Sequence, residues 1–371
     1  MGAIMMGNIE EPLKALNAVC PYYTMFPLEF PLKTLAGRAK KGDWVADPFC
    51  GRGTTNFAAR LMGMPSVGID SSPVAVALTK AKLADARMSD VVRVTTQILR
   101  KMPKNVTVPS GDFWSLAYDP KVLRSLCWLR RELIRDCSSD ARALLRAILL
   151  GALHGPRTKH VFSHLSNQCP RTYAPKPDYA VRFWRKHDME PPAVDVLELV
   201  RVRARRYLTR RPKVSRADVR IGDSRVPETW DGRIFHWIIT SPPYYGMRTY
   251  IPDQWLRNWF VGGPATVQYE APAMEMNHAS PVAFADDLRK VWKGLAEHAS
   301  RNARLAIRFG GISDRNVDTV QLLKLSLAES GWRLQTIVPA GDAETGRRQA
   351  RQFLKDRTAP KAEHDFHAVL A

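Results

Sequence analysis

Two short stretches of the sequence combine residue types that could bind a ligand or act on one. The first is "DPFCGRGTT" (residues 47–55), in which Gly51 and Gly53 follow an apolar segment and precede a predicted helix. Glycine lets the backbone approach a ligand closely, and the first N–H groups of a helix are free to bind it. Asp70 ends the next predicted strand, where a carboxylate can bond both hydroxyls of a ribose. Since the turn lacks a third glycine and the lysine of a phosphate loop, a nucleoside cofactor without a phosphate fits better than a dinucleotide.

The second stretch is "IFHWIITSPPYYG" (residues 234–246), an apolar run that stops at Pro242 and Pro243. Proline locks its own φ and biases the preceding residue to an extended conformation, so the carbonyls that follow the strand are held rigidly. Ser241 adds a side-chain acceptor, and Tyr244 adds a flat aromatic face. The alternative interpretation is a Pro-Pro strand terminator with incidental aromatics.

The elements around these stretches predict how they are positioned. Residues 44–47, 54–61 and 66–69 have the patterns of a strand, a helix and a strand, and such a βαβ crossover implies a parallel sheet. Further strands are predicted in "DVRIGDSR", "RIFHWIIT", "ARLAIRFG", "WRLQTIVPA" and "DFHAVLA". We therefore expect a Rossmann-like α/β fold with a mostly parallel seven-stranded sheet, whose ligands bind beyond the carboxyl ends of the strands.

A helical, Pro-rich insertion is predicted at residues 116–214, between an α/β part at 1–115 and another at 215–371. In "RALLRAILLGAL" the apolar residues share one helical face; they are Leu144, Leu145, Ile148, Leu149 and Ala152. A loop with many prolines follows, and "VDVLELVRVRARRYL" resumes as a helix. The sequence therefore predicts that a separate helical region interrupts the α/β unit of this chain.

Charge and cysteine content restrict the partner and the compartment. The chain has 56 Lys and Arg against 36 Asp and Glu, and the formal net charge of +20 favours a polyanionic partner over a merely soluble basic surface. The five cysteines include no CxxC pair, which argues against a disulfide framework or a zinc ribbon and for a reducing compartment. Because no export or membrane segment is visible, we expect a cytoplasmic protein.

Together, the two stretches resemble motifs of the S-adenosylmethionine-dependent amino-methyltransferases of DNA. "DPFCGRGTT" is similar to the DPF-x-G-x-G-T cofactor motif of that family, and "TSPPYYG" to its (D/N/S)-P-P-(Y/F/W) catalytic motif. "YYTMFPLEFPLKTL" resembles an additional cofactor segment. The resemblance covers about residues 20–85 and 215–371. It implies a methyltransferase whose residues 1–115 bind the cofactor, whose residues 215–371 carry catalysis, and whose insertion recognises the target.

The resemblance also implies the cofactor contacts. Asp47 would approach the amino group of the cofactor, Asp70 the ribose, and Asp223 the adenine amino group, although Asp223 could instead cap a turn or a helix. The complete expected cofactor set is Phe26, Pro27, Asp47, Pro48, Phe49, Gly51, Gly53, Thr54, Asp70, Ser71, Asp223 and Ser224.

The resemblance assigns catalysis to Ser241, Pro242, Pro243 and Tyr244. The exocyclic amino group of cytosine or adenine is a poor nucleophile, because its lone pair is delocalised into the ring. Acceptors held at fixed positions can draw it towards a tetrahedral nitrogen by accepting its two protons. The target base must leave the duplex, and it would stack on Tyr244.

Serine in this motif favours N4 of cytosine, with N6 of adenine as the close alternative. In this chain the cofactor motif precedes the catalytic one, the reverse of the order in many family members with serine. An RNA base methyltransferase and a catalytically silent, cofactor-sensing nucleic-acid-binding protein are further alternatives. Methylation of ring carbon 5 needs a cysteine nucleophile, and no cysteine follows this strand.

The insertion contains "RVRARRYLTRRPK", whose arginines could neutralise phosphates, although a solvated helix face is the alternative. The residues expected to contact DNA are Arg201, Arg203, Arg205, Arg206, Tyr173 and Lys176. His160, His164 and Cys169 lack a second ligand pair, so we expect no metal. The implied partners are double-stranded DNA and a cognate restriction endonuclease.

Overall fold

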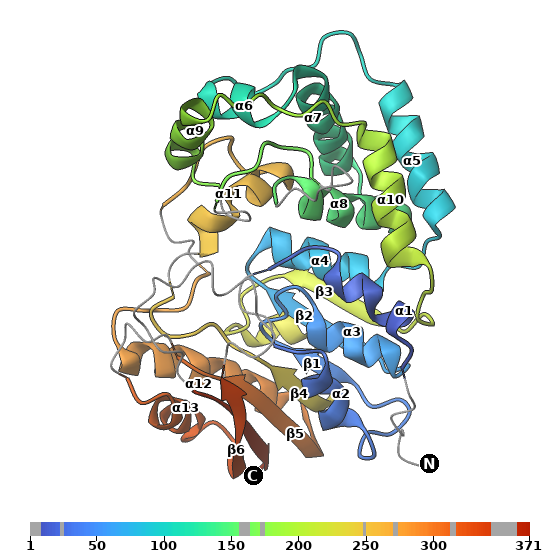
Figure 1. The fold of residues 1–371 in the computed structure, drawn as a ribbon. Coiled ribbons are helices and arrows are strands. Elements are labelled where there is room, and N and C mark those ends of the chain that lie inside the picture. Colours follow the sequence, from blue (N-terminus) through green and yellow to red (C-terminus); the bar gives the residue numbers. More distant parts are fainter. Residues whose placement is uncertain are drawn as a thin grey trace.

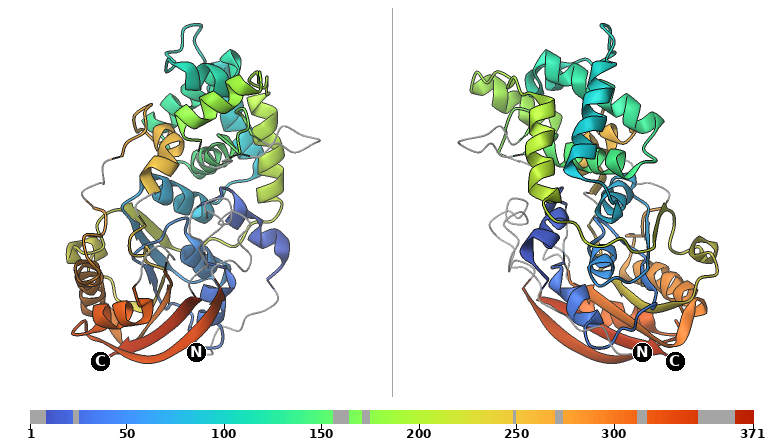
Figure 2. Two further views of the ribbon diagram at one scale, coloured as in Figure 1. Left: turned by 60° about the vertical axis from the view of Figure 1, so that its left-hand side comes forward. Right: turned by 90° about the vertical axis from the view of Figure 1, so that its right-hand side faces the viewer.

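The computed structural model describes residues 9–22, 26–155, 164–170, 175–247, 250–269, 274–311, 317–342 and 362–371. Figure 1 shows a twisted sheet with its helices in the lower half of the molecule and a layer of helices in the upper half. The two turned views in Figure 2 show the same division. Most of the segment for which the sequence predicts a helical insertion lies in the upper layer.

The strands in the described ranges form one seven-stranded sheet of order β3-β2-β1-β4-β5-β7-β6. Their bounds are β1 Val45–Asp47, β2 Ser66–Asp70, β3 Ala217–Ile221, β4 Phe235–Thr240, β5 Ala299–Phe309, β6 Trp332–Asp342 and β7 Ala362–Leu370. The pairs from β3 to β5 are parallel, whereas β7 runs antiparallel to both β5 and β6. The prediction of a mostly parallel, seven-stranded Rossmann-like α/β sheet is confirmed, and the sheet is mixed because of β7.

Alternate residues of the central strands pack on opposite faces of this sheet, as the period of two in a strand requires. Val45 of β1 and Ile239 of β4 belong to a core with the helices α2 (Glu29–Leu35) and α3 (Thr54–Leu61). Ala46 and Ile238, one position away, belong to a core with α12 (Pro281–Glu297) and α13 (Thr319–Leu327). Helices thus cover both faces of the sheet. A ligand can therefore reach it at the ends of the strands.

The strand order reverses direction between β1 and β4. From β1 the chain continues to β2 and β3 on one side, and from β4 it continues to β5 on the other. In open α/β sheets the crevice at such a switch point is where ligands bind. The turns after β1 and β4, which carry the two motifs, lie at this point.

The helical layer comprises α5 Met88–Arg100, α6 Asp112–Ala117, α7 Pro120–Arg135, α8 Asp140–Ala152, α9 Pro177–Lys186, α10 Val196–Leu208 and α11 Tyr250–Phe260. α5 packs against α7, α8 and α10, so this layer begins before the boundary at residue 116 that the sequence predicts. The expected apolar face of α8 is fully buried; it consists of Leu144, Leu145, Ile148, Leu149 and Ala152.

α4 (Pro73–Leu83) joins the two layers, because it packs on β2 and β3 below and on α8 above. Trp255 and Trp259 of α11 are buried in the same core as α8. The remaining short elements are α1 Glu11–Lys14 and the 3-10 helices Ala15–Ala18 and Pro227–Trp230. Within the described ranges, no helix has the length and the apolar character needed to cross a bilayer.

Candidate functional site

A cavity of about 820 Å³ lies at the carboxyl ends of the parallel strands, within the usual range for small-molecule sites. Turns from four different strands contribute to its wall. The predicted site residues on the wall are Phe26, Pro48, Phe49, Gly51, Thr54, Asp70, Ser71, Asp223, Ser224, Ser241 and Pro243. The cavity therefore brings most of the expected cofactor set together with part of the predicted catalytic motif.

Other predicted residues lie away from this wall. Pro27, Asp47, Gly53, Pro242 and Tyr244 are described but do not line the cavity, and neither do Lys176 and the four arginines of α10 (Arg201, Arg203, Arg205 and Arg206). Tyr173 and His160 lie outside the described residues.

The turn after β1 is tightly constrained. Gly51 and Gly53 have φ of 52° and 74°, a region that favours glycine. A Cβ atom on Gly53 would lie 2.6 Å from Oγ1 of Thr79, whose hydroxyl donates to the Gly51 carbonyl at 3.1 Å. Both glycines are thus required by the backbone, and α4 holds the turn through Thr79.

We expect Gly53→Ala to destabilise the protein by about 2–4 kcal/mol, because it adds a steric clash to the cost of a left-handed conformation. Gly63→Ala is the matched control, since Gly63 has φ of 69° but nothing within 4 Å of an added Cβ. Urea unfolding should show a loss of only about 1–2 kcal/mol for that variant. Equal losses for the two variants would show that the Thr79 contact costs nothing.

The carboxylate of Asp70 is half-buried and fixed by the backbone. Its Oδ2 accepts the Gly51 N–H at 2.8 Å, and its Oδ1 accepts the Ser72 N–H at 2.9 Å. Burial raises its pKa to about 6 despite these bonds. Each carboxylate oxygen can accept more than one hydrogen bond, so Asp70 can still accept bonds from ligand hydroxyls in the cavity.

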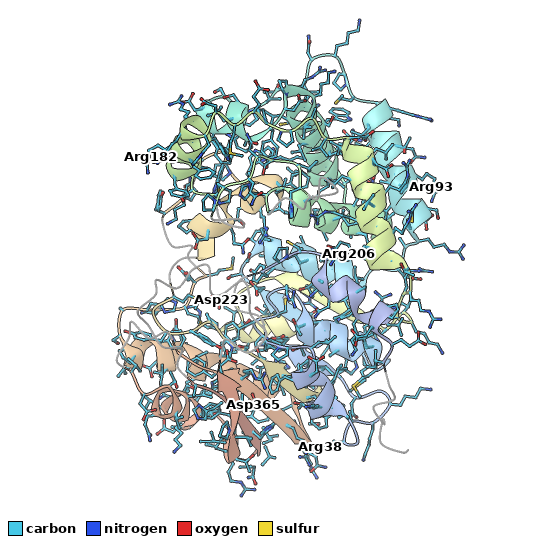
Figure 3. All side chains as sticks on the ribbon, viewed as in Figure 1. Arg38, Arg93, Arg182, Arg206, Asp223 and Asp365 are labelled. Atoms are coloured by element: carbon cyan, nitrogen blue, oxygen red, sulfur yellow. The ribbon has the colours of Figure 1, made fainter. Side chains whose placement is uncertain are left out.

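Asp223 follows β3 and lies between the sheet and the helical layer (Figure 3). Arg225 binds it through Nε to Oδ1 at 2.9 Å, and also reaches Asp287 at 2.6 Å. Burial opposes ionisation of Asp223, but the hydrogen bonds from Arg225 outweigh it, and its pKa lies below the usual value. The neighbouring Ser224 hydroxyl donates to the Pro48 carbonyl, which ties this turn to the one after β1.

Ser241 is half-buried on the cavity wall, and its hydroxyl forms no hydrogen bond with any described residue. Thr240, just before it, is fully buried and donates to Oδ1 of Asp47 at 2.7 Å. Ser241 thus presents a free polar group to the cavity at the end of β4.

Tyr244 faces away from the cavity in this conformation. It is 4% exposed, and its ring packs edge-on against Phe309 at 5.8 Å between centroids. Its hydroxyl donates to Glu363 of β7, which is itself 3% exposed. The sequence carries no signal for this contact, because the two residues are 119 positions apart.

Asp47 lies behind the cavity wall with an exposure of 0%. Its Oδ1 accepts the Phe49 N–H at 3.1 Å as well as the Thr240 hydroxyl, while Oδ2 has no hydrogen-bond partner in the described part of the chain. The nearby Thr55 hydroxyl donates to the Ile239 carbonyl instead. Burial raises the pKa of Asp47 to about 7.

Several cavity residues were missed by the sequence analysis. Gln254 and Asn258, four residues apart on α11, line the wall, as do residues 261–264 and 274–276 and His278. One feature of the sequence could have indicated them, because α11 follows directly after the predicted catalytic motif. Its tryptophans pack into the helical layer, and Trp255 donates to the Pro175 carbonyl at 2.9 Å, so an adjacent face of α11 is directed at the cavity.

The arginines of α10 are used in different ways. Arg201 pairs with Glu198, and beyond the helix Arg210 pairs with Glu10 and Arg211 with Asp85. Arg205 and Arg206 are exposed, and the Arg206 guanidinium carbon lies 5.6 Å from the centroid of the Tyr207 ring. Arg203 is half-buried on the same helix.

In the described ranges, no group of three or more His, Cys, Asp or Glu side chains could hold a metal ion. Cys169 Sγ lies 3.5 Å from Nε2 of His154, whose Nδ1 lies 2.6 Å from the Ser166 hydroxyl. These side chains are buried in the helical layer, away from the cavity.

Solved structures show only a distant likeness to this chain. The rRNA methyltransferase aviRa from Streptomyces viridochromogenes is 12% identical with a TM-score of 0.37, over 99% of this chain and 96% of that one. TrmN from Thermus thermophilus is 10% identical with a TM-score of 0.36, over 93% and 48%. A geranyl diphosphate methyltransferase in complex with GPP and sinefungin is 10% identical with a TM-score of 0.36, over 92% and 77%.

No curated protein matches the chain. Residues 9–81, by contrast, match the model of a DNA methylase family. This segment contains β1, the turn with Gly51 and Gly53, and Asp70 at the end of β2. Over the part of the chain that forms one side of the cavity, the protein is therefore similar to DNA methylases.

Proposed function

We propose that this protein transfers a methyl group from S-adenosylmethionine to an exocyclic amino group of a DNA base, and specifically to N4 of cytosine. The observation that carries the proposal is that Ser241, with its free hydroxyl, lines the same cavity as the glycine turn after β1 and the carboxylate of Asp70. The match of residues 9–81 to a DNA methylase model supports the class of reaction.

The ends of β3, β2 and β1 lie side by side, and the three parts of such a cofactor would lie along them in the same order. Asp223 at β3 would bind the adenine end, Asp70 at β2 the ribose, and the turn after β1 the methionine end. The target base would then lie at Ser241, after β4. Two polar groups near the β1 turn have no hydrogen-bond partner within the described chain, namely Oδ2 of Asp47 and Nε of Arg52, and both suit the charged ends of a methionine moiety.

The bound cofactor supplies an electrophilic methyl group on a sulfonium. The protein must make the amino nitrogen nucleophilic, and Ser241 on the cavity wall would accept one of its protons and so help to localise its lone pair. The carbonyl of Pro242, a residue that does not line the cavity in this conformation, would accept the second proton once the base is bound. When the nitrogen takes the methyl group, the sulfonium would become a neutral thioether and one amino proton would be lost to solvent, so that charge and bonds balance. Pro242 and Pro243 would hold these acceptors rigidly. This would raise the rate of transfer, because even a small misplacement of reacting groups slows a reaction.

Tyr244 would stack on the extruded base only after its ring leaves Phe309 and its hydroxyl leaves Glu363. We therefore propose that base entry exposes Tyr244. Tyr244→Ala should lose about 1–3 kcal/mol of base binding, while cofactor binding persists.

The product identifies the function. The protein should be incubated with isotope-labelled S-adenosylmethionine and duplex DNA, single-stranded DNA or transfer RNA, and the nucleosides analysed by mass spectrometry. We expect label in N4-methylcytosine from duplex DNA. Label in N6-methyladenine would change the base but keep the mechanism, label mainly in transfer RNA would favour the RNA alternative, and label in 5-methylcytosine or no label at all would contradict the proposal.

DNA binding should depend steeply on salt, since exposed arginines release counterions when they contact phosphates. Replacing Arg205 and Arg206 with glutamine should flatten the slope of log affinity against log salt by about 2. Arg210→Gln with Arg211→Gln is the control, because both side chains already pair with carboxylates. Equal slopes for the wild type and the Arg205/Arg206 variant would assign that part of α10 to a solvated surface.

The same proposal includes a cognate endonuclease, which would cut the same site when it is unmethylated. It also includes a cytoplasmic location in a prokaryote or phage-infected cell.

A further inference from the structure

Arg52 is a cationic side chain on the cavity wall without a protein partner. It lies between Gly51 and Gly53, and it forms no hydrogen bond or ion pair with the part of the chain that the structure describes. Its Nε is buried, and burial lowers the pKa of its guanidinium to about 10, so it stays charged at neutral pH. The residue as a whole is half-buried, and a charge that is partly withdrawn from water without a partner is costly, so a bound anion would lower this cost.

Two further basic side chains, Lys82 and Arg257, do not line the cavity but lie near enough to Cys20, as Arg52 does, to act on its thiol. Lys82 is 1% exposed and donates to the Asn17 side-chain oxygen at 2.8 Å, and Arg257 is 5% exposed and donates to Gln254 at 2.9 Å. Neither forms an ion pair with a described carboxylate. The charge of Arg52 helps to lower the pKa of Lys82, after burial, so the two cations lie close enough to repel each other.

The group on which these basic side chains act is the thiol of Cys20, which is neutral. The charges of Arg257, Arg52 and Lys82 all act on Cys20, but burial dominates and raises the pKa of this thiol, which therefore stays protonated. Cys20 therefore supplies no negative charge to these basic side chains. An anionic group with two oxygens would suit the planar, bidentate guanidinium of Arg52.

The position of Arg52 in the sheet narrows the choice of anion. Arg52 follows β1, which lies between β2, with Asp70, and β4, with Ser241. The anion thus lies between the end of the cavity assigned to the ribose and the end assigned to the target base. Resting on the proposed function, we propose that Arg52 binds the carboxylate of the cofactor's methionine moiety, with Lys82 and Arg257 adding positive potential.

The test compares two ligands that differ only in this carboxylate. S-adenosylhomocysteine carries it, and decarboxylated S-adenosylhomocysteine keeps the nucleoside, the sulfur and the amine. Titration calorimetry on the full chain should show that Arg52→Gln weakens S-adenosylhomocysteine binding at least tenfold, the effect of losing a charge-assisted pair. Binding of the decarboxylated ligand should change less than about twofold, within the error of such comparisons.

Arg52→Lys, which keeps the charge but not the fork, should lose less affinity than Arg52→Gln and is the second variant if the latter folds poorly. Arg38→Gln, an exposed arginine on the far side of the sheet part, is the control and should bind both ligands as the wild type does (Figure 3).

Three outcomes would overturn the inference. Equal losses for both ligands would show that Arg52 only supports the turn. Unchanged binding of S-adenosylhomocysteine, together with a flatter salt dependence of DNA binding, would assign Arg52 to a DNA phosphate. Failure of the wild type to bind either ligand would contradict the proposed cofactor itself, and the inference with it.

Discussion

Replacing Ser241 with alanine should lower kcat for methyl transfer by about 10²–10³-fold, the effect of removing one preorganised hydrogen-bond partner from a reacting centre. The Kd for S-adenosylmethionine should stay close to that of the wild type, because the Ser241 hydroxyl bonds no described residue and its removal breaks no contact of the fold. Single-turnover kinetics with labelled cofactor separate the transfer step from binding.

Ser224→Ala is the matched control for this variant. Ser224 also lies on the cavity wall, but its hydroxyl donates to the Pro48 carbonyl and therefore holds two turns together. We expect a loss of about 1 kcal/mol in stability or cofactor affinity and a nearly unchanged transfer step. Ser241→Asn, which restores a side-chain acceptor, should recover part of kcat. A Ser241→Ala enzyme within threefold of the wild-type kcat would remove this residue from the mechanism.

The parallel half of the sheet was predictable because its signals are local. The apolar runs that form β1 and β2 end at an aspartate, the run that forms β4 is followed by Ser-Pro-Pro, and such patterns need no knowledge of distant residues. The positive φ of Gly51 and Gly53 agrees with the close backbone turn expected there. The insertion of β7 between β5 and β6 was not predictable, because antiparallel pairing between distant segments leaves no local pattern.

The grouping of the candidate residues around one cavity was predictable to a similar extent. Asp70, Asp223 and Ser241 come from different strands, and they line one cavity because the carboxyl ends of parallel strands share an edge. The burial of Tyr244 depends on Glu363, and the pairing of Arg210 and Arg211 depends on Glu10 and Asp85. Such contacts arise from tertiary packing, so a basic run such as that of α10 cannot be divided into paired and free arginines from its pattern alone.

Asp47 leads to the second large effect, on stability. Burial raises its pKa to about 7, even though the hydrogen bonds from Thr240 and the Phe49 N–H oppose the rise. In the unfolded chain an aspartate has a pKa of about 3.9. Between about pH 4 and pH 7 the folded protein therefore binds more protons at Asp47 than the unfolded chain does, and its stability falls as the pH rises. Above this window the ionised carboxyl costs about 4 kcal/mol.

Asp47→Asn keeps the shape of the side chain and an oxygen that can accept from Phe49 and Thr240, but it cannot ionise. Urea unfolding at pH 8 should therefore find the variant more stable than the wild type by up to about 4 kcal/mol, and the difference should shrink towards pH 4. Because Asp70 is present in both proteins, the difference between their pH profiles isolates Asp47. A constant difference from pH 4 to pH 8 would contradict the raised pKa.

The same variant tests whether Asp47 also serves the cofactor. A cationic amino group near its free Oδ2 would favour the ionised carboxylate, so binding of S-adenosylmethionine by the wild type at about pH 6.5 should release part of a proton. Calorimetry in two buffers of different ionisation enthalpy measures that release, which Asp47→Asn should reduce along with the affinity. If the variant gains stability at pH 8 and yet binds the cofactor as tightly as the wild type with the same proton release, Asp47 is a buried support of the β1 turn and the amino group binds elsewhere in the cavity.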